Sequence, residues 1–247
     1  MDLKETFRVR EDVAYRHPWE LSRASSIISV IQAKPHSTRY ADIGAGDLYF
    51  TRELRRCTDL PVYAVDIGYP DVERNAEVIC LPALDLLPEA EIDCMILLDV
   101  LEHVADERGF LEGLLMKLKP SGSLVITVPA FQFLFSAHDR FLEHKRRYSR
   151  KQLIAVLKEV DIVVDRSFYF YLSLLFVRLL QVFLEKTGID SGINKGAGAW
   201  RYARRHPLTS ILTALLNADF AIARFMGGVS ILLPGLSLCC LCHKRSS

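Results

Sequence analysis

The chain has 247 residues, of which half are hydrophobic and a quarter are charged, and its formal net charge is +1. This length is enough for one large domain with a substantial core, or for a domain with a subdomain. The near-neutral charge balance excludes a strongly basic protein of the kind that binds polyanions, so we expect no nucleic-acid partner.

The first predicted element is a helix over residues 19–31, where apolar residues recur at helical spacing. Short apolar runs and helical patterns then alternate along the chain. We predict strands at 40–43, 62–65, 78–81, 93–98, 124–128 and from 162 onward, and helices between them at 48–56, 106–118 and 149–159. This alternation predicts an α/β fold with a parallel, doubly wound sheet. Ligands of such sheets bind at the carboxyl ends of the strands, so the residues after each strand are the candidates for a site.

A glycine turn, Asp42-Ile43-Gly44-Ala45-Gly46, follows the first of these strands. Glycines permit a tight turn and let backbone amides approach a ligand closely. The turn departs from the dinucleotide fingerprint because Tyr49 stands at the third glycine position. Asp42 would also repel a pyrophosphate, whereas it suits a cationic ligand. A strand-to-helix turn without a ligand is the alternative.

Acids also follow the next two strands. Asp66 lies about twenty residues after Gly46, the offset of a ribose-binding acid, and its two oxygens can accept both ribose hydroxyls. This arrangement fits NAD and S-adenosylmethionine equally. Asp85 and Leu86 follow the third strand, where they flank an adenine edge or simply form an exposed turn.

The most specific motif follows the fourth strand and has the sequence Asp99-Val100-Leu101-Glu102-His103-Val104. A Leu-Lys-Pro-Ser-Gly turn at 118–122 and the buried strand at 124–128, followed by Pro129, come next. Together these segments resemble the class I methyltransferases, especially the subgroup related to ubiquinone-biosynthesis O-methyltransferases, and the resemblance extends over about residues 40–164. It implies a Rossmann-like, doubly wound, seven-stranded sheet with an antiparallel last strand, and S-adenosylmethionine as the cofactor.

The resemblance also implies which residues contact the cofactor. Asp42, Gly44 and Gly46 would lie near its methionine part, and Asp66 at its ribose. Asp85 and Leu86 would lie near its adenine. The full implied set is Asp42, Gly44, Ala45, Gly46, Asp66, Ile67, Asp85, Leu86 and Asp99. For Glu102 and His103 we favour a structural role, in which they orient the loop and cap the next helix, over direct catalysis.

The loop after the fifth strand, residues 131–148, lies over the strand ends where the acceptor should bind. His138 and His144 are the candidates for a general base, since a histidine can take a proton from a hydroxyl near neutral pH. Arg146, Arg147 and Tyr148 are the candidates for substrate binding, because guanidinium groups bind phosphate or carboxylate in bidentate geometry. In the structural alternative these arginines pair with Asp139 and Glu143 and fix the loop.

Two strongly apolar segments, 168–184 and 208–226, dominate the C-terminal third, and a basic, aromatic stretch at 191–206 separates them. We expect two helices inserted before the last strand of the sheet. They suit a cap over the active site or a homodimer interface, and they equally suit peripheral contact with an anionic membrane. The predicted domain organisation is an N-terminal helical segment (1–38), a methyltransferase core (39–167), a helical insertion (168–228), and a final strand of the core with a tail (229–247).

Cys239, Cys240 and Cys242 precede His243, and all four are types of metal ligand. Neighbours on a strand point to opposite faces, and no second ligand pair stands at zinc-site spacing, so we expect no metal ion. Reduced thiols fit a cytoplasmic protein.

The sequence therefore predicts a methyltransferase that uses S-adenosylmethionine to methylate a small or lipid-linked acceptor, at oxygen rather than another atom. A nicotinamide-dependent oxidoreductase and a non-catalytic binding protein with a nucleotide fold are the alternatives.

Overall fold

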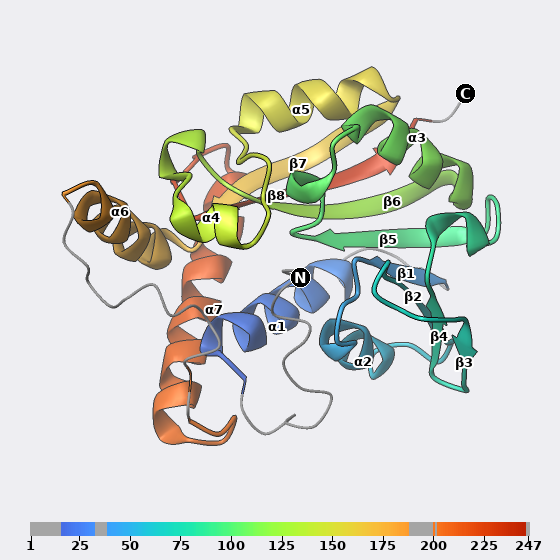
Figure 1. Ribbon diagram of the computed structural model, residues 1–247, viewed down its shortest axis with the longest axis horizontal. Coiled ribbons are helices and arrows are strands. Elements are labelled where there is room, and N and C mark those ends of the chain that lie inside the picture. Colours follow the sequence, from blue (N-terminus) through green and yellow to red (C-terminus); the bar gives the residue numbers. More distant parts are fainter. Residues whose placement is uncertain (1–15, 33–38, 188–199, 201, 246–247) are drawn as a thin grey trace.

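An eight-stranded sheet runs through the computed structural model, which describes residues 16–32, 39–187, 200 and 202–245 (Figure 1). The strand order is β3-β4-β2-β1-β5-β6-β8-β7. The strands are β1 (Tyr40–Ile43), β2 (Val62–Val65), β3 (Glu73–Arg74), β4 (Val78–Leu81), β5 (Ile92–Leu98), β6 (Leu118–Pro129), β7 (Ile162–Phe170) and β8 (Ser237–Lys244). The five central strands from β4 to β6 are parallel, whereas β8 runs antiparallel between β6 and β7.

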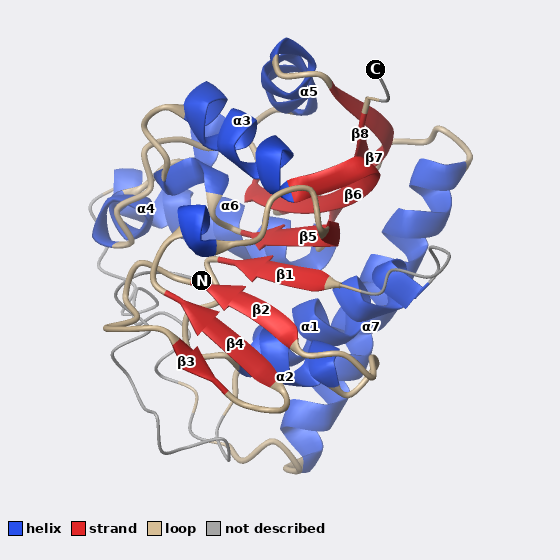
Figure 2. Cartoon of the chain, turned by 90° about the vertical axis from the view of Figure 1, so that its right-hand side faces the viewer, coloured by secondary structure: helices blue, strands red, loops and turns tan. Residues whose placement is uncertain are grey.

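Helices cover both faces of this sheet (Figure 2). The helices are α1 (Pro18–Gln32), α2 (Tyr49–Arg55), α3 (Glu107–Lys117), α4 (Ala137–Phe141), α5 (Arg150–Glu159), α6 (Leu172–Lys186) and α7 (Pro207–Gly228). Helices α3 and α5 pack with Met95 and Leu97 of β5 on one face, while α1, α2 and α7 pack with Cys94 and Ile96 on the other. Because alternate residues of β5 enter two separate cores, this strand is apolar from Cys94 to Leu98, as a central parallel strand should be.

The predicted Rossmann-like fold with an antiparallel last strand is confirmed. The sheet has eight strands rather than seven, because the two-residue β3 adds an antiparallel edge next to β4. Strand β6 also begins at Leu118, so the turn predicted at 118–122 belongs to the strand, with Ser121 at a φ of 59°.

The apolar segment predicted as a helix over 168–184 is divided between two elements. Its first three residues end β7, and α6 begins only at Leu172, after Tyr171 turns the chain at a φ of 62°. Phe168 and Phe170 point to the same side of the sheet and pack edge-on against Phe220 of α7, with ring centroids 5.5 and 5.2 Å apart. Alternate residues at 168–170 therefore face the same side, as in a strand, and not at the helical spacing that was predicted. Most of the basic stretch at 191–206 lies outside the described residues.

The C-terminal cysteines lie in β8 and are buried. Cys240 and Cys242 face the core beneath α3 and α5, whereas Cys239 faces the other core. The alternation expected for a strand is observed, and it separates these thiols between two layers.

Candidate active site

The carboxyl ends of the parallel strands bring the predicted cofactor residues to one edge of the sheet. The turn after β1 is the centre of this edge, and its shape requires glycine at two positions: Gly44 has a φ of 74° and Gly46 a φ of 54°. A Cβ atom on Gly44 would lie 2.6 Å from Cγ2 of Val100. The turn therefore has no room for a side chain at Gly44, and its backbone atoms can lie directly against a ligand. We call this turn the glycine cradle.

Asp66 ties the end of β2 to this cradle. Its carboxylate accepts hydrogen bonds from the backbone N–H groups of Gly46 and Gly68, each at 2.8 Å. Each carboxylate oxygen has a second acceptor position, so Asp66 can still bind a ribose hydroxyl. Beside it, Ile67 is 80% exposed, and Asp85 and Leu86 are also exposed at the end of β4. The geometry suits the predicted ribose and adenine contacts, which remain predictions.

Asp42 has a different environment, because its side chain is buried in the wall behind the turn. It accepts a hydrogen bond from Oγ1 of Thr51 at 2.6 Å. Burial raises the pKa of Asp42 to about 6, although this hydrogen bond opposes the shift. Its role near the methionine part of the cofactor stays a prediction.

Two arginines from the N-terminal segment reach the same edge. Arg23 of α1 forms an ion pair with Asp99, which also accepts a hydrogen bond from Oγ1 of Thr127 at 3.2 Å. Arg16 pairs with Asp47 and lies over the ring of Tyr49 at 4.4 Å. Sequence reasoning missed both arginines. Guanidinium groups at this position can bind the carboxylate of an amino-acid ligand, while Asp99 can bind an amino group.

The most unusual group lies after β5, in the short 3₁₀ helix Leu101–His103 and the loop that follows α4. Glu102 is fully buried, and neither of its carboxylate oxygens has a hydrogen-bond partner among the described residues. Burial, together with the charge of Asp99, raises the pKa of Glu102 to about 8. The expectation that Glu102 caps the next helix is wrong. Asp106 caps α3 instead, and its side chain accepts a hydrogen bond from the backbone N–H of Gly109 at 3.0 Å.

His144 lies between Glu102 and a second buried carboxylate, Asp139. Its Nδ1 is 3.0 Å from Oδ1 of Asp139, and its Nε2 is 4.0 Å from Oε1 of Glu102. Asp139 is also bound by Arg147 and Arg178, each at 2.7 Å. Burial pushes the pKa of Asp139 upward, but the hydrogen bonds and charges of these three partners outweigh it and hold that pKa well below its usual range.

His103 completes this cluster, with its ring edge-on to that of His144 at 4.8 Å. Ligand atoms of Glu102, His103 and His144 all lie within 4.8 Å of one another. Imidazole and carboxylate donors suit a divalent transition metal, and a carboxylate such as Asp139 commonly orients a histidine ligand through its other nitrogen. These three described residues form a possible metal site. It was not considered when the sequence led us to expect no metal ion.

The three residues predicted to bind substrate form hydrogen bonds and ion pairs with other groups of the protein. Arg147 donates to Asp139 and to the carbonyl of Ala130, and Arg146 pairs with Glu107. The buried hydroxyl of Tyr148 donates to the same Glu107 at 2.5 Å. The pair of Arg147 with Asp139 matches the structural alternative, whereas Arg146 pairs with Glu107 and not with Glu143. A role in substrate binding stays a prediction for all three residues.

The two predicted bases also separate. His144 belongs to the buried cluster, whereas His138 lies on α4, outside the group formed by Glu102, His103 and His144. The geometry therefore favours His144 over His138 as the candidate general base, and a catalytic role stays a prediction for both.

Comparison with protein families identifies the class of enzyme and its cofactor. A family model described as a methyltransferase domain matches residues 15–166, which is more than half of the chain. The chain belongs to this methyltransferase family. It is therefore an enzyme with S-adenosylmethionine as its cofactor, and the prediction of a methyltransferase is confirmed over the nicotinamide-dependent and non-catalytic alternatives. The glycine cradle and the acids at the strand ends fit this cofactor, which supplies a methyl group activated by its sulfonium.

Solved structures confirm the fold. The [4+2]-cyclase SpnF is 14% identical with a TM-score of 0.58, over 99% of this chain and 92% of that one. A methyltransferase from Haloferax volcanii, solved with its activator Trm112, is 13% identical with a TM-score of 0.53, over 93% and 96% of the two chains. A sarcosine dimethylglycine methyltransferase from Galdieria sulphuraria is 16% identical with a TM-score of 0.51, over 92% and 85%. A comparison with curated proteins gave no match.

Proposed function

We propose that this methyltransferase methylates a hydroxyl oxygen of a small or lipid-linked acceptor, in the manner of the O-methyltransferase subgroup whose motifs it resembles. The observation that carries the proposal is the position of His144, held between an ionised Asp139 and a buried Glu102 at the end of β5. A hydroxyl acceptor must lose a proton during methyl transfer, and this arrangement provides a group to accept it.

The proton goes to Nε2 of His144. When Nδ1–H donates to Asp139, the Nε2 atom carries a lone pair on the side of Glu102. The charge of Asp139 then stabilises the imidazolium that forms, as a buried aspartate does in other histidine bases. Such proton transfer contributes on the order of 10²–10⁴ in rate, while alignment of the acceptor with the methyl group contributes about 7–11 kcal/mol.

The metal-type donor set offers a second route to the same result. A divalent cation held by Glu102, His103 and His144 would lower the pKa of an acceptor hydroxyl that bound to it. The two routes make opposite predictions for a chelator, because only the second one needs the cation for activity.

Apolar surface near the loop supports an acceptor with an apolar part. Phe133 and Phe141 of the loop are 62% and 58% exposed, and Phe176 of α6 is 64% exposed. Helix α6 packs on this loop, and Arg178 on α6 binds Ser136 at 2.7 Å (Figure 1). Exposed aromatic side chains on this loop and on the helix that packs against it are suited to contact an apolar part of the acceptor.

Transfer of a labelled methyl group from S-adenosylmethionine to hydroxyl-bearing aromatic and polyprenyl acceptors tests the proposal. His144→Gln should lower kcat by at least about 100-fold with little change in adenosylhomocysteine affinity. His243→Gln is the matched control, because His243 also contacts an aspartate, Asp165 at 2.6 Å, but lies in β8 next to the amino end of β7. A product methylated at nitrogen, or full activity of His144→Gln, would overturn O-methylation by this base. Loss of activity on adding a chelator would assign the reaction to the metal route.

A further inference from the structure

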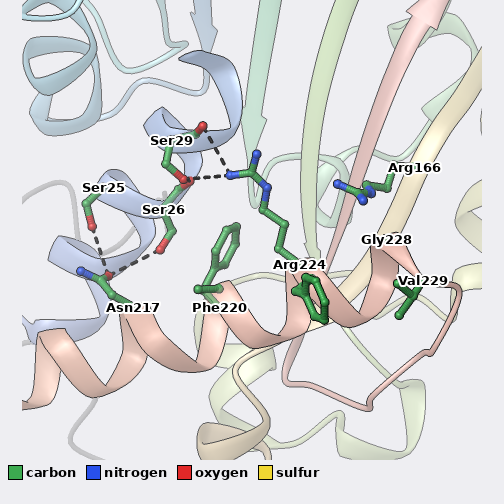
Figure 3. A pocket seen from close by; sticks show the side chains of 11 residues that line it. Ser25, Ser26, Ser29, Arg166, Asn217, Phe220, Arg224, Gly228 and Val229 are labelled. Carbon is green, nitrogen blue, oxygen red and sulfur yellow. Dashed lines mark hydrogen bonds between the residues drawn. The ribbon is translucent and has the colours of Figure 1, made fainter. Parts of the chain in front are cut away.

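A cavity of about 620 Å³ lies between α1, α7 and β7 and has no part in the site described above (Figure 3). Arg166 lies in the middle of β7, and Ser29 lies in the last turn of α1, just before the chain enters the sheet. Neither residue belongs to the carboxyl ends of the strands, where the cofactor is predicted to bind. The cavity needs a separate explanation.

Its polar side has the composition of an anion site. Arg166 and Arg224 both line the cavity, and no acidic residue does. Among the described residues neither guanidinium has a carboxylate partner, and Arg224 makes only long hydrogen bonds, of 3.3 and 3.4 Å, to the hydroxyl and carbonyl of Ser29. A side chain at Gly228 would collide with the guanidinium of Arg166, which shows how closely this charge lies against the end of α7. Two uncompensated guanidinium groups beside hydroxyls suit a phosphate group.

The other side of the cavity is apolar and continues onto the surface. Phe225 and Val229 line the cavity and are 65% and 53% exposed. They also belong to a stripe of exposed apolar side chains along one face of α7: Leu208, Ile211, Leu215, Ile222, Phe225 and Val229. The opposite face, with Leu216 and Phe220, packs into the core. A ligand with a phosphate in the cavity would place its apolar part along this stripe.

Helix α7 is long and apolar enough to span a membrane by length and composition, with a mean hydropathy of 1.3. It nevertheless packs on α1 and β7 as part of the fold. Because one face of α7 is held against α1 and β7, its exposed apolar face could lie on a membrane surface but the helix could not cross a membrane without leaving the fold.

The charge of the surface around α7 favours a membrane over a second copy of the chain as the partner of the exposed stripe. Tyr202, Arg205 and His206 are exposed at the start of α7, and the sequence has no acidic residue from Ser191 through Ala218. Pairing this surface with its own copy would bring the unpaired arginines of two copies together, whereas an anionic lipid surface neutralises them.

We propose that the exposed stripe of α7 docks on an anionic phospholipid membrane, and that the cavity bounded by Arg166 and Arg224 takes a lipid phosphate headgroup. This site is independent of the methyl-transfer chemistry. It would hold the enzyme at the surface where an acceptor with an apolar part resides.

Sedimentation of the full chain with vesicles tests the proposal. We expect retention on vesicles of phosphatidylcholine with phosphatidylglycerol, loss of retention at high salt, and little retention on phosphatidylcholine alone. The double variant Arg166→Gln/Arg224→Gln should bind anionic vesicles about 30-fold more weakly, since each basic residue near such a surface contributes roughly fivefold. Phe225→Ser should also weaken binding. Arg108→Gln is the matched control, because Arg108 is exposed on α3, beside a different face of the sheet.

Each other outcome overturns the proposal. Equal binding to both vesicle types would remove the headgroup site, and equal binding by the double variant would place the contact elsewhere. Displacement of bound protein by millimolar glycerol phosphate would assign the cavity to a free phosphate ligand. A concentration-dependent dimer that Phe225→Ser disrupts would assign the stripe to a second copy. Adenosylhomocysteine binding, unchanged in every variant, shows that the fold is intact and separates these results from a failure of the proposed acceptor chemistry.

Discussion

Glu102 should make the protein less stable as the pH rises through neutrality, and Glu102→Gln should remove that effect. The carboxyl group is fully buried and has no hydrogen-bond partner among the described residues, so it folds most easily in the neutral form. Its pKa is raised from 4.5 to about 8 in the folded protein. A group with a raised folded pKa contributes stability that is complete below its unfolded pKa and is lost as the pH rises through the folded value.

The magnitude follows from the two pKa values. Each unit of difference corresponds to about 1.4 kcal/mol, so the folded state loses about 3 kcal/mol of unfolding free energy from this group by pH 7, and about 5 kcal/mol well above pH 8. Glutamine has nearly the same shape but no titrating proton. Glu102→Gln should therefore match the parent near pH 4 and exceed its stability by about 3 kcal/mol at pH 7, while activity falls.

Urea denaturation at pH 5, 6, 7 and 8, with a chelator present, measures this difference. Subtracting the parent from the variant cancels other groups that titrate in the range, including Asp42, whose pKa is raised to about 6. Glu112→Gln is the control, because Glu112 is 52% exposed on α3 and lies outside the buried cluster. A difference for Glu102→Gln that stays constant within about 0.5 kcal/mol from pH 5 to 8 would refute the idea that burial keeps this carboxyl neutral.

Three further changes test the cofactor edge and the buried ion network. Gly44→Ala should abolish adenosylhomocysteine binding in calorimetry and destabilise the fold by about 1–3 kcal/mol, because its φ is positive and its Cβ would meet Val100; Val100→Ala in the same chain should recover part of the stability. Asp99→Asn should weaken adenosylmethionine binding at least tenfold and should also lower thermal stability, because it removes the charge that pairs with the buried Arg23; unchanged affinity would remove Asp99 from the cofactor site. Arg178→Met should destabilise the protein by about 3 kcal/mol in urea at pH 7, since it removes a partner from the buried charge of Asp139, and a loss below 1 kcal/mol would contradict that view.

The sequence predicted the parallel strands well because each of them is buried on both faces. Strands 62–65 and 78–81 were placed at their observed limits, and the fourth strand within one residue. The same signal failed at 168–170, where an apolar run is compatible with either a strand or a helix. Pairing of Phe168 and Phe170 with β8 makes them a strand, and that pairing joins segments about 70 residues apart.

Some residues of the candidate site could also be predicted from the sequence, and others could not. The acids at the strand ends were predictable, since parallel strands bring their carboxyl ends to one edge of the sheet. The ion pair of Arg23 with Asp99 and the contact of Arg178 with Asp139 were not, because they join residues 76 and 39 positions apart. Nothing in the local sequence around these arginines distinguishes them from solvated surface charges, so only the fold reveals their partners.

Two buried carboxylates on either side of one histidine explain why the acceptor proton should go to His144 rather than to either acid. Asp139 and Glu102 are both fully buried, yet their pKa values move in opposite directions. Asp139 has two guanidinium groups and an imidazole around it and stays ionised, whereas Glu102 has no hydrogen-bonded cation and stays neutral near pH 7. Carboxyl groups whose environments separate their pKa values mark the two roles of an acid–base site. Asp139 is too weak a base to accept a hydroxyl proton, but its fixed charge stabilises a protonated His144. A neutral Glu102 adds no second negative charge that would keep the imidazolium from releasing its proton, and so the histidine can return to its starting state after each methyl transfer.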